Sequence, residues 1–409
     1  MARILIIGGS LGGLFAANLL LRDGHDVTVF ERAASSLEGR GAGIVTHPQL
    51  DAALARAGLT DLNELGVAVR GRVLLGADGS VRESLALPQV LTSWSKLYSL
   101  LKGVFPSARY QNDAVLMSHR QSVEGLSAEV KLNGVMRTYD ADLLIACDGI
   151  RSAVREIYAP GKPPIYAGYV AWRGMCEETA LSQFTLDSLF CFFGFGLAPG
   201  EQILGYPVVS TSTHKQRSYN VVWYRSAPDE PALRNLMSDA DGVHYPHGIS
   251  PAKVSYRHIA EMRRAAHAML APQFAEVMEK TAQPFLQPIY DFASDSMAFG
   301  RVALLGDAAS VARPHVGMGV TKAAQDACEL ADCIRKYGAT PESLQAYSAI
   351  RVPASCVVVE RGRELGAGLA RPSNSKANDE STATWTLSNT AIDPSTFTGM
   401  LGVPAGKNH

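Results

Sequence analysis

Residues 1–31 alternate short apolar runs with blocks of small and polar residues. An apolar, β-branched run at residues 3–7 predicts a buried parallel strand, and a block of glycines follows it. Residues 14–23 have helix-forming composition, and residues 26–30 predict a second strand that is followed by Glu31. A strand, a turn, a helix and a strand within about 30 residues are typical of one half of a nucleotide-binding domain.

The middle of the chain follows another pattern, in which many of the apolar runs are aromatic. Residues 94–104 predict a helix, and in the aromatic block that follows no helical period is found until Pro251. This block, residues 166–224, therefore predicts an antiparallel sheet that differs in kind from residues 1–150. Strands are predicted at residues 67–75, 80–87, 126–132, 136–139, 142–147, 166–175, 188–195, 202–209 and 218–224.

The last third of the chain returns to the first pattern. Residues 301–305 resemble a parallel strand, and from Arg371 the chain becomes polar, which predicts a tail that wraps or frays. We therefore expect an α/β fold with a Rossmann-like domain around a parallel sheet, a domain built on an antiparallel sheet, and C-terminal helices. Helices are predicted at residues 259–268, 272–281, 320–337 and 343–365, the last with a bend at Pro353.

Composition and charge narrow the class of protein. The chain of 409 residues is 47% hydrophobic and carries 38 Lys+Arg against 39 Asp+Glu, a formal net charge of −1. This balance excludes a disordered chain, and without a basic excess we expect neither nucleic acid nor membrane as a partner. Residues 4–21 carry no charge, but the glycines at their centre favour a tight turn over a signal peptide or membrane helix.

The cysteines add a second restriction. Six of them are scattered without a CxxC pair, and no spacing of Cys and His fits a zinc site. We therefore expect no disulfide scaffold, no bound metal, and a reducing, cytoplasmic location.

The glycine block predicts a dinucleotide site. Gly8 and Gly13 occupy the outer positions of the pattern GxGxxG, and Ser10 stands at the middle one. The first glycine serves the turn, the second lets a pyrophosphate approach and the third allows helix–strand packing. The following helix offers free amides and a positive dipole end to phosphates, and Glu31 is correctly spaced for the ribose hydroxyls. The turn alone does not say which dinucleotide binds.

Two later motifs identify the dinucleotide. Residues 148–155, DGIRSAVR, match DGxxSxxR, and Gly306-Asp307 ends an apolar strand and is followed by Pro314, Gly317 and Gly319. Over residues 1–370 this set resembles the aromatic-ring hydroxylases, flavin monooxygenases of the para-hydroxybenzoate hydroxylase type. Three further stretches resemble the branch of that family that hydroxylates 2,6-dihydroxypyridine in nicotine degradation: residues 40–44, 92–98 and 222–225.

The resemblance implies a bound FAD, transient binding of NADH or NADPH, a homodimer, and two domains. Residues 1–72, 96–163 and 286–370 would form the FAD-binding domain, residues 73–95 and 164–285 the substrate-binding domain, and residues 371–409 a C-terminal tail. We find no second glycine-rich fingerprint, so a separate nicotinamide domain is not expected.

The resemblance also assigns residues to FAD. Asp307 would accept a hydrogen bond from a ribityl hydroxyl, and the amides that open the helix at residues 317–321 would face the flavin N1–C2=O edge. Ser310, Met318 and Thr321 replace the family's usual His, Gln and Asn. The full set implied for FAD is Gly8, Ser10, Leu11, Gly12, Gly13, Glu31, Arg32, Arg40, Leu116, Asp148, Asp307, Pro314, Gly317, Met318, Gly319, Val320 and Thr321.

Trp94 is a further departure, because many relatives carry an arginine there that reaches toward the flavin phosphates or ribityl chain. Tryptophan cannot make that contact. Arg40 and Arg3 are the two candidates for its replacement, and the sequence does not choose between them.

The resemblance implies hydroxylation of an electron-rich aromatic or heteroaromatic ring with NAD(P)H and O2 through a flavin C4a-hydroperoxide. A base near the ring would help by ionising the substrate hydroxyl. His47, His315 and Tyr224 are candidates, and each is equally compatible with a packing role. Of Phe192, Phe193, Tyr206 and Trp172, we expect one or two to line an apolar substrate pocket.

The preferred reaction is 2,6-dihydroxypyridine to 2,3,6-trihydroxypyridine. Alternatives are another phenolic substrate such as a salicylate-like acid, and a non-hydroxylating flavin oxidoreductase. A simple dehydrogenase explains neither DGxxSxxR nor the late Gly-Asp motif, and the halogenase string WxWxIP is absent. A third hypothesis is a binding protein that keeps the flavin fold without catalysis.

Overall fold

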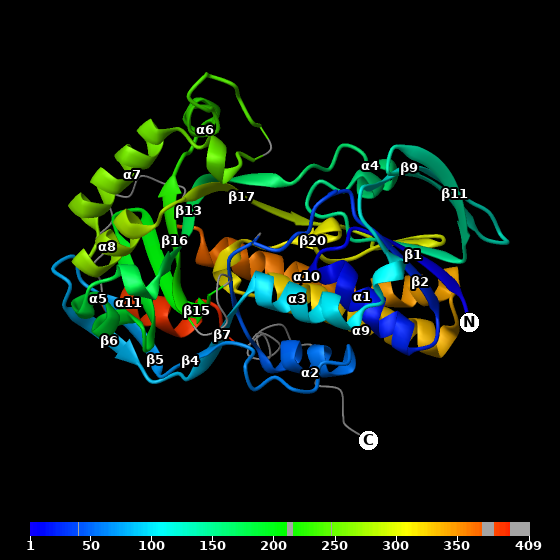
Figure 1. The fold of residues 1–409 in the computed structure, drawn as a ribbon, viewed down its shortest axis with the longest axis horizontal. Helices are drawn as coiled ribbons and strands as arrows, with labels where there is room; N and C mark the ends of the chain where they lie inside the picture. The colour runs from blue at the N-terminus through cyan, green and yellow to red at the C-terminus, as the bar shows by residue number, and fades with distance from the viewer. Residues whose placement is uncertain (40, 211–215, 247, 370–379, 393–409) are drawn as a thin grey trace.

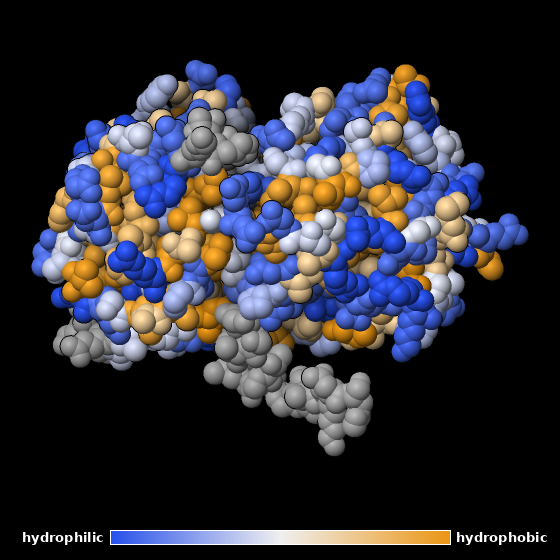
Figure 2. All heavy atoms as spheres, turned by 60° about the horizontal axis from the view of Figure 1, so that its bottom comes forward, coloured by the Kyte–Doolittle hydropathy of each residue, from blue (hydrophilic) through white to orange (hydrophobic). Residues whose placement is uncertain are grey.

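The computed structural model describes residues 1–39, 41–210, 216–246, 248–369 and 380–392. Figure 1 shows two large sheets side by side along the long axis, with the N-terminal parallel sheet on the right and the aromatic sheet on the left. On the face drawn in Figure 2, polar and apolar residues are interspersed and a hollow separates the two lobes.

The first sheet has six strands in the order β18-β19-β12-β1-β2-β8. Its central strand, β1, pairs in parallel with β2 on one side and β12 on the other, and Ile4 and Ile6 are fully buried. The predicted parallel sheet is confirmed. Its strands are β1 (Arg3–Ile7), β2 (Asp26–Phe30), β8 (Tyr110–Gln111), β12 (Leu143–Ala146), β18 (Ala298–Phe299) and β19 (Val302–Leu304).

Helices pack around this sheet because their apolar faces need cover. Helix α1 contacts α3 and α9, and α2 also lies against α9. Helix α10 contacts both α9 and β17, so it spans the junction between the two large sheets (Figure 1). These helices are α1 (Leu11–Arg22), α2 (Pro48–Arg56), α3 (Trp94–Val104), α4 (Ala153–Tyr158), α9 (Gly319–Tyr337) and α10 (Pro341–Leu365), which contains Pro353.

The second sheet has eight strands in the order β20-β17-β13-β16-β15-β14-β5-β6. All neighbours are antiparallel except β14 and β5. The predicted antiparallel sheet is confirmed. Its strands are β5 (Gly71–Leu75), β6 (Val81–Leu85), β13 (Ile165–Glu177), β14 (Phe192–Ala198), β15 (Glu201–Val209), β16 (Arg217–Ser226), β17 (Phe285–Ala293) and β20 (Ser310–Val311).

Alternate residues of the second sheet have different surroundings, as the two-residue period of a strand requires. Trp172 and Trp223 belong to the apolar cluster shared with α5, α7 and α8. Tyr169, Ala171 and Tyr224 belong to the cluster of the opposite face. The helices on the first face are α5 (Gln183–Leu189), α7 (Tyr256–Met269) and α8 (Pro272–Lys280).

Two three-stranded sheets complete the described fold. In one, β10 and β11 form a hairpin through Asn133 and Gly134, whose φ angles of 49° and 80° suit the predicted tight turn. The strands are β9 (Ala114–Gln121), β10 (Leu126–Leu132) and β11 (Val135–Ala141) in one sheet, and β3 (Gly43–Val45), β4 (Val67–Val69) and β7 (Gln89–Ser93) in the other.

Two strand predictions in the middle of the chain are wrong. Residues 67–75 are not one strand, because β4 pairs with β7 whereas β5 pairs with β6 and β14 in the eight-stranded sheet. Residues 188–195 begin in α5, and the strand starts only at Phe192.

The expectation that no helix precedes Pro251 in this block is also wrong. Besides α5, the chain forms α6 (Glu230–Leu236), and each helix has seven residues. Ser182 and Asp229 cap them by accepting hydrogen bonds from the amides of Thr185 and Ala232. Two helical turns are too short to give a clear period in the sequence.

Of the two alternatives predicted for the tail, wrapping and fraying, residues 380–392 show the first. Residues 380–389 form helix α11 (Glu380–Asn389), which packs against β5 and β6, and Leu387 and Ala391 are buried. The rest of the predicted tail, residues 371–379 and 393–409, lies outside the described residues. The domain boundaries stay a prediction, and the one between residues 72 and 73 falls inside β5.

All six cysteines are unpaired. Among the residues that the structure describes, no cluster of His, Cys, Asp and Glu is arranged to hold a metal ion. Within the same ranges, no helix combines the length and the apolar character needed to cross a membrane.

Candidate functional site

The glycine turn joins β1 to α1, which starts at Leu11, three residues before the predicted start. Gly8 has a φ of 104°, and a side chain there would overlap the backbone carbonyl of Cys147. A side chain at Gly13 would overlap the carbonyl oxygen of Gly8. Both outer glycines are therefore required by close backbone contacts. Ser10 precedes α1 without capping it through its side chain, and no acidic residue stands in the first turn.

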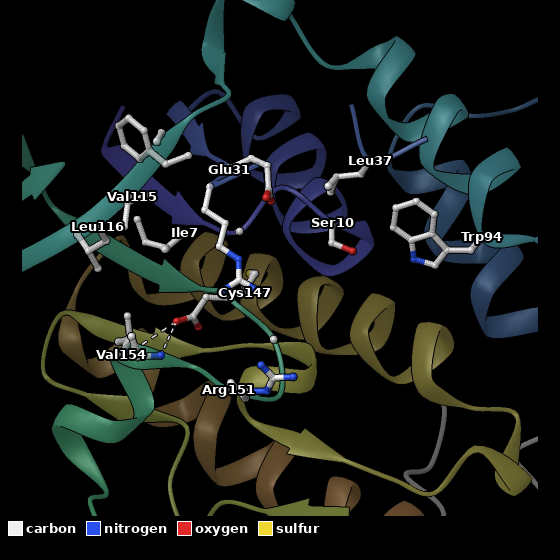
Figure 3. Close-up of a pocket in the computed structure, with 17 residues that line it drawn as sticks. Ile7, Ser10, Glu31, Leu37, Trp94, Val115, Leu116, Cys147, Arg151 and Val154 are labelled. Atoms are coloured by element: carbon white, nitrogen blue, oxygen red, sulfur yellow. Dashed lines mark hydrogen bonds between the residues drawn. The ribbon is translucent and has the colours of Figure 1, made fainter. Parts of the chain in front are cut away.

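A cavity of about 350 Å³ opens beside this turn, and we call it the nucleotide cavity (Figure 3). Glu31 stands in its wall, where its carboxylate accepts hydrogen bonds from the amides of Gly9 and Ala33, both at 2.8 Å. Glu31 thus holds the turn as well as facing the cavity. Six of the residues predicted for FAD line it: Gly8, Ser10, Glu31, Arg32, Leu116 and Asp148.

The motif at residues 148–155 joins this cavity to the next one. Asp148 Oδ2 accepts from the amide of Ala153 at 2.9 Å, while its buried Oδ1 has no hydrogen-bond partner within the described chain. Arg155 donates to the carbonyls of Ile150 and Ala308 at 2.5 and 2.8 Å, which ties the motif to the Gly306–Ala308 turn. Asp148 therefore presents a free acceptor of the kind that a sugar hydroxyl satisfies.

Trp94 lines the nucleotide cavity and stacks on Tyr98, with ring centroids 5.0 Å apart. Arg3 does not compensate for the missing arginine. It is the first residue of β1, at the end of the strand away from the glycine turn, and it lines a different cavity, near Arg120. Arg40, the other candidate, lies outside the described residues.

The structure instead brings Arg32 and Arg151 to the lining of the nucleotide cavity. Figure 3 labels Arg151 there. Burial lowers the pKa of Arg151, and the positive charge of Arg32 lowers it further, so the two guanidinium groups are close enough to interact. Sequence reasoning overlooked Arg151, although its place inside DGxxSxxR marked it as adjacent to the site. Two cations near one another would suit a pyrophosphate.

A second cavity, of about 210 Å³, lies between the loop that precedes α9 and the eight-stranded sheet, and we call it the ring cavity. Ile150 lines it, whereas Gly149 and Arg151 line the nucleotide cavity, so one turn borders both. Its other walls include the predicted residues Asp307, Pro314, His315, Gly317, Met318, Gly319, Val320 and Tyr224.

Asp307 follows β19, is exposed at the wall of the ring cavity, and its carboxylate makes no hydrogen bond within the described chain. Surrounding protein atoms that partly remove water from this carboxyl group raise its pKa, and the positive charge of Lys322 opposes that effect. An acceptor without a partner on a cavity wall is suited to a hydroxyl donor.

A buried ionic network holds the turn that carries Asp307. Asp326 accepts from the Gly306 amide at 3.2 Å and forms ion pairs with Lys322 at 3.2 Å and Arg351 at 2.8 Å. Lys322 also donates to the Gly306 carbonyl at 3.1 Å. Sequence reasoning missed this network. The i,i+4 spacing of Lys322 and Asp326 inside a buried helix was the available signal.

His315 and Tyr224 meet at the ring cavity, with ring centroids 4.1 Å apart. Burial, assisted by Arg313, lowers the pKa of His315 to about 3, and burial raises the pKa of Tyr224 to about 12. Both side chains are therefore uncharged near neutral pH. His315 Nε2 is 2.9 Å from the Tyr169 hydroxyl, and its buried Nδ1 has no partner in the described ranges.

The third candidate, His47, lies apart from this pair. It precedes α2, and its Nδ1 is 3.0 Å from the Thr321 hydroxyl. Neither His47 nor Thr321 belongs to the lining of the ring cavity. Leu11, Gly12 and Gly13 belong to the first turn of α1, beside the nucleotide cavity but not in its lining. The roles of all these residues toward FAD and substrate stay predictions.

Two of the four aromatic candidates line the ring cavity. Phe193 and Tyr206 lie in its wall, whereas Phe192 and Trp172 pack with the helices on the opposite face of the sheet. The period of the strand decides this division. The described residues thus fit FAD at both cavities: close backbone at Gly8, an unsatisfied oxygen on Asp148, and an unpaired carboxylate on Asp307.

Comparison with known proteins gives two family models. The model of an NAD(P)-binding Rossmann-like domain matches residues 6–46, and the model described as FAD binding domain-like matches residues 166–291. These matches confirm the predicted cofactor class.

Two characterised relatives cover most of the chain. The 2,6-dihydroxypyridine 3-monooxygenase of Paenarthrobacter nicotinovorans is 30% identical over 347 residues, which are 84% of this chain and 86% of the relative. The 3-amino-4-hydroxybenzoate 2-monooxygenase of Streptomyces cremeus is 28% identical over 392 residues, 92% of this chain and 90% of the relative.

Solved structures agree with the fold. The 2,6-dihydroxypyridine-3-hydroxylase from Arthrobacter nicotinovorans superimposes with a TM-score of 0.84 at 27% identity, covering 93% of this chain and 96% of the other. Klebsiella pneumoniae HpxO complexed with FAD and uric acid has a TM-score of 0.76 at 21% identity, with coverage of 97% and 95%. The predicted fold class is confirmed.

Proposed function

The chain belongs to the FAD-dependent aromatic-hydroxylase family of flavin monooxygenases, and from this premise we propose that it hydroxylates an electron-rich heteroaromatic ring, with 2,6-dihydroxypyridine as substrate and 2,3,6-trihydroxypyridine as product. The chain is therefore an oxidoreductase, as predicted. The observation that carries the proposed reaction is the ring cavity itself, where aromatic side chains of the large sheet face Asp307 and the loop before α9.

One FAD molecule would extend through both cavities and contact the residues around each. Glu31 and Asp148 would accept from ribose or ribityl hydroxyls, and Asp307 from a ribityl hydroxyl. When bound and reduced by NADH or NADPH, FAD activates O2 and supplies the electrophilic oxygen. The amides opening α9 would stabilise negative charge at the edge of the flavin ring.

The neutral pair His315 and Tyr224 would orient the substrate. A histidine whose pKa is about 3 is a weak base, so its role would be a hydrogen bond from Nδ1 to a ring hydroxyl rather than full removal of a proton. A ring hydroxyl that is already acidic needs only this help. Phe193 and Tyr206 would exclude water from the reacting ring.

The test follows NADH and NADPH oxidation by the FAD-loaded protein under air, with and without 2,6-dihydroxypyridine, and measures 2,3,6-trihydroxypyridine by chromatography. We expect stimulated oxidation and product formation in proportion to the cofactor consumed. Stimulation and product with salicylate but not with the pyridine would favour the phenolic-acid alternative. An absence of product from every electron-rich ring would reject the hydroxylase function.

We also propose the biological setting that the resemblance implies, namely nicotine degradation by a cytoplasmic homodimer. The support is the similarity to a 2,6-dihydroxypyridine 3-monooxygenase. Light scattering on the FAD-loaded protein would test the dimer, because a mass equal to that of one chain, 43.7 kDa, contradicts it.

A further inference from the structure

Thr390 is a polar residue on the wall of the ring cavity, in a part of the chain where the sequence predicted only a tail. It directly follows helix α11 and is 3% exposed, so its side chain is removed from bulk water. Its hydroxyl makes no hydrogen bond within the described chain. Because buried hydroxyls in folded proteins are nearly always paired, we look for its partner in the molecule that fills the cavity.

Hydrogen bonds hold the backbone around Thr390 in place. The carbonyls of Thr390 and Ala391 accept from the buried guanidinium of Arg72 at 2.5 and 2.9 Å. The Ala391 carbonyl also accepts from Gln89 at 3.3 Å. The amide of Ala391 donates to the His315 carbonyl at 3.0 Å. These bonds fix the position of Thr390 relative to His315, which lines the same cavity.

Ala391 adopts a backbone conformation that needs such support. Its φ angle of 49° lies in the left-handed region, which alanine seldom occupies. Gly317 permits the close approach, because a side chain at that position would overlap Ala391. Residues that are held in strained conformations by their surroundings are concentrated at binding sites. The segment is therefore a built part of the cavity wall.

The proposed substrate offers more polar groups than His315 and Tyr224 use. These two residues would orient one ring hydroxyl, and 2,6-dihydroxypyridine also carries a second hydroxyl and a ring nitrogen. Much of the cavity wall is apolar, including Phe193, Leu204 and Val222, and a polar ring group buried against it without a partner is costly. A threonine hydroxyl can both donate and accept, so it suits either group.

We propose that Thr390 determines substrate specificity by forming a hydrogen bond with a second polar group of the ring. This inference rests on the proposed function and names a residue that selects its substrate. The shared chemistry is an uncharged polar group on an electron-rich ring, which is either the second hydroxyl or the ring nitrogen. The segment after α11 then belongs to the substrate site, although the predicted substrate-binding domain ends at residue 285.

The chain offers matched controls for this role. T390V replaces the hydroxyl with a methyl group, whereas T390S keeps the hydroxyl. Thr386, one helical turn earlier, is 4% exposed and lines a separate cavity of about 220 Å³ but not the ring cavity. Thr390 also borders this outer cavity, so T386V reports on the outer cavity alone.

The experiment measures ring binding to the FAD-loaded protein by titration of the flavin absorbance, independently of turnover. The probes are phenol, resorcinol with two hydroxyls, 2-hydroxypyridine with one hydroxyl and the ring nitrogen, and 2,6-dihydroxypyridine with both. We expect T390V to weaken the binding of 2,6-dihydroxypyridine about 5- to 30-fold, as for a hydrogen bond whose loss leaves a buried group unpaired. Phenol binding should be almost unchanged in T390V, and T390S and T386V should bind all four rings as wild type does.

The two intermediate probes identify the ring group. A loss in T390V with resorcinol but not with 2-hydroxypyridine would assign the contact to the second hydroxyl. The opposite pattern would assign it to the ring nitrogen. A purely structural effect of the substitution would weaken all four rings alike, so this pattern separates recognition from packing.

Several results would overturn the inference: wild-type affinity of T390V for 2,6-dihydroxypyridine, an equal loss with phenol, an equal loss in T390S or T386V, or no ring binding by wild type. If T390V does not retain FAD, T390A takes its place with the same expectations. Wild type that binds the rings in the expected pattern but forms no product would reject the proposed hydroxylation and leave the role of Thr390 intact.

Discussion

The carboxylate of Asp307 reaches the ring cavity without a partner in the described chain, and we therefore predict that this residue contributes directly to FAD binding. Replacing it by alanine should weaken FAD binding about 10- to 100-fold, as expected for the loss of a charge-assisted hydrogen bond. Titration of the apoprotein with FAD measures this. Asp295→Ala is the control, since that side chain is 77% exposed in a surface ion pair with Lys162. Wild-type affinity in Asp307→Ala would show that the ribityl chain lies elsewhere.

His315 gives a prediction about pH. Burial holds its pKa at about 3, below its ordinary value of 6.5, so between these values the unfolded chain binds a proton that the folded chain does not. Stability should therefore fall as the pH drops from 6.5 toward 3, with this residue contributing up to about 1.4 kcal/mol per pH unit.

His315→Gln should lose less stability than wild type over this range. Urea unfolding of both proteins at saturating FAD measures the difference between them. His267→Gln, with a side chain that is 60% exposed on α7, serves as the control and should follow wild type. Parallel stability curves for wild type and His315→Gln would contradict the buried, neutral state of His315.

Helix α11 carries a prediction at the scale of the element. The two residues after it, Thr390 and Ala391, line the ring cavity. Arg72, which is fully buried, donates to the carbonyls of Leu387, Thr390 and Ala391 at 2.7, 2.5 and 2.9 Å. Residues 387–391 thus supply hydrogen-bond acceptors to the buried guanidinium of Arg72 and form part of the wall of the ring cavity.

A chain that ends at residue 379 should therefore lose about 3 kcal/mol or more of stability, because Arg72 keeps its charge and its bond to Gln89 but loses three backbone acceptors. It should also consume NAD(P)H without forming product in proportion, since water would reach the ring cavity. A chain that ends at residue 392 keeps the segment and is the matched control. Equal stability and equal coupling in the two chains would show that α11 has no such role.

The nucleotide cavity and the ring cavity belong to different sheets, yet both are lined by the turn at residues 148–155. We therefore predict that FAD, which would occupy both cavities, stabilises the whole molecule as one unit. FAD should stabilise the folded protein by about 2.7 kcal/mol at a concentration 100 times its Kd. Calorimetry should show one transition that moves to higher temperature as FAD is added. AMP and FMN, which reach one cavity each, should shift it less. Two transitions, of which FAD moves only one, would mean that the sheets unfold separately.

Local patterns determined the elements that are predicted to hold the cofactor. The strand, turn and helix at residues 3–22 follow from β-branched residues, glycines at fixed spacing and a helix-forming run, and these features act over a few neighbouring residues. The helix at residues 94–104 and the strand at 126–132 match their predictions for the same reason. The three motifs also identified the family, because each encodes a backbone shape that a flavin nucleotide requires.

Only the tertiary structure decided which side chains face the ring cavity. Strand register placed Phe193 in its wall and Phe192 on the other face, although the two are adjacent in sequence. Arg72 and Ala391 meet although 319 positions separate them, and the expected tail became a wall for that reason. The sequence by itself thus determined the cofactor and the chemistry, since these depend on local backbone geometry. The fold alone decided the wall of the ring cavity, because partners brought together by long-range pairing leave no local pattern.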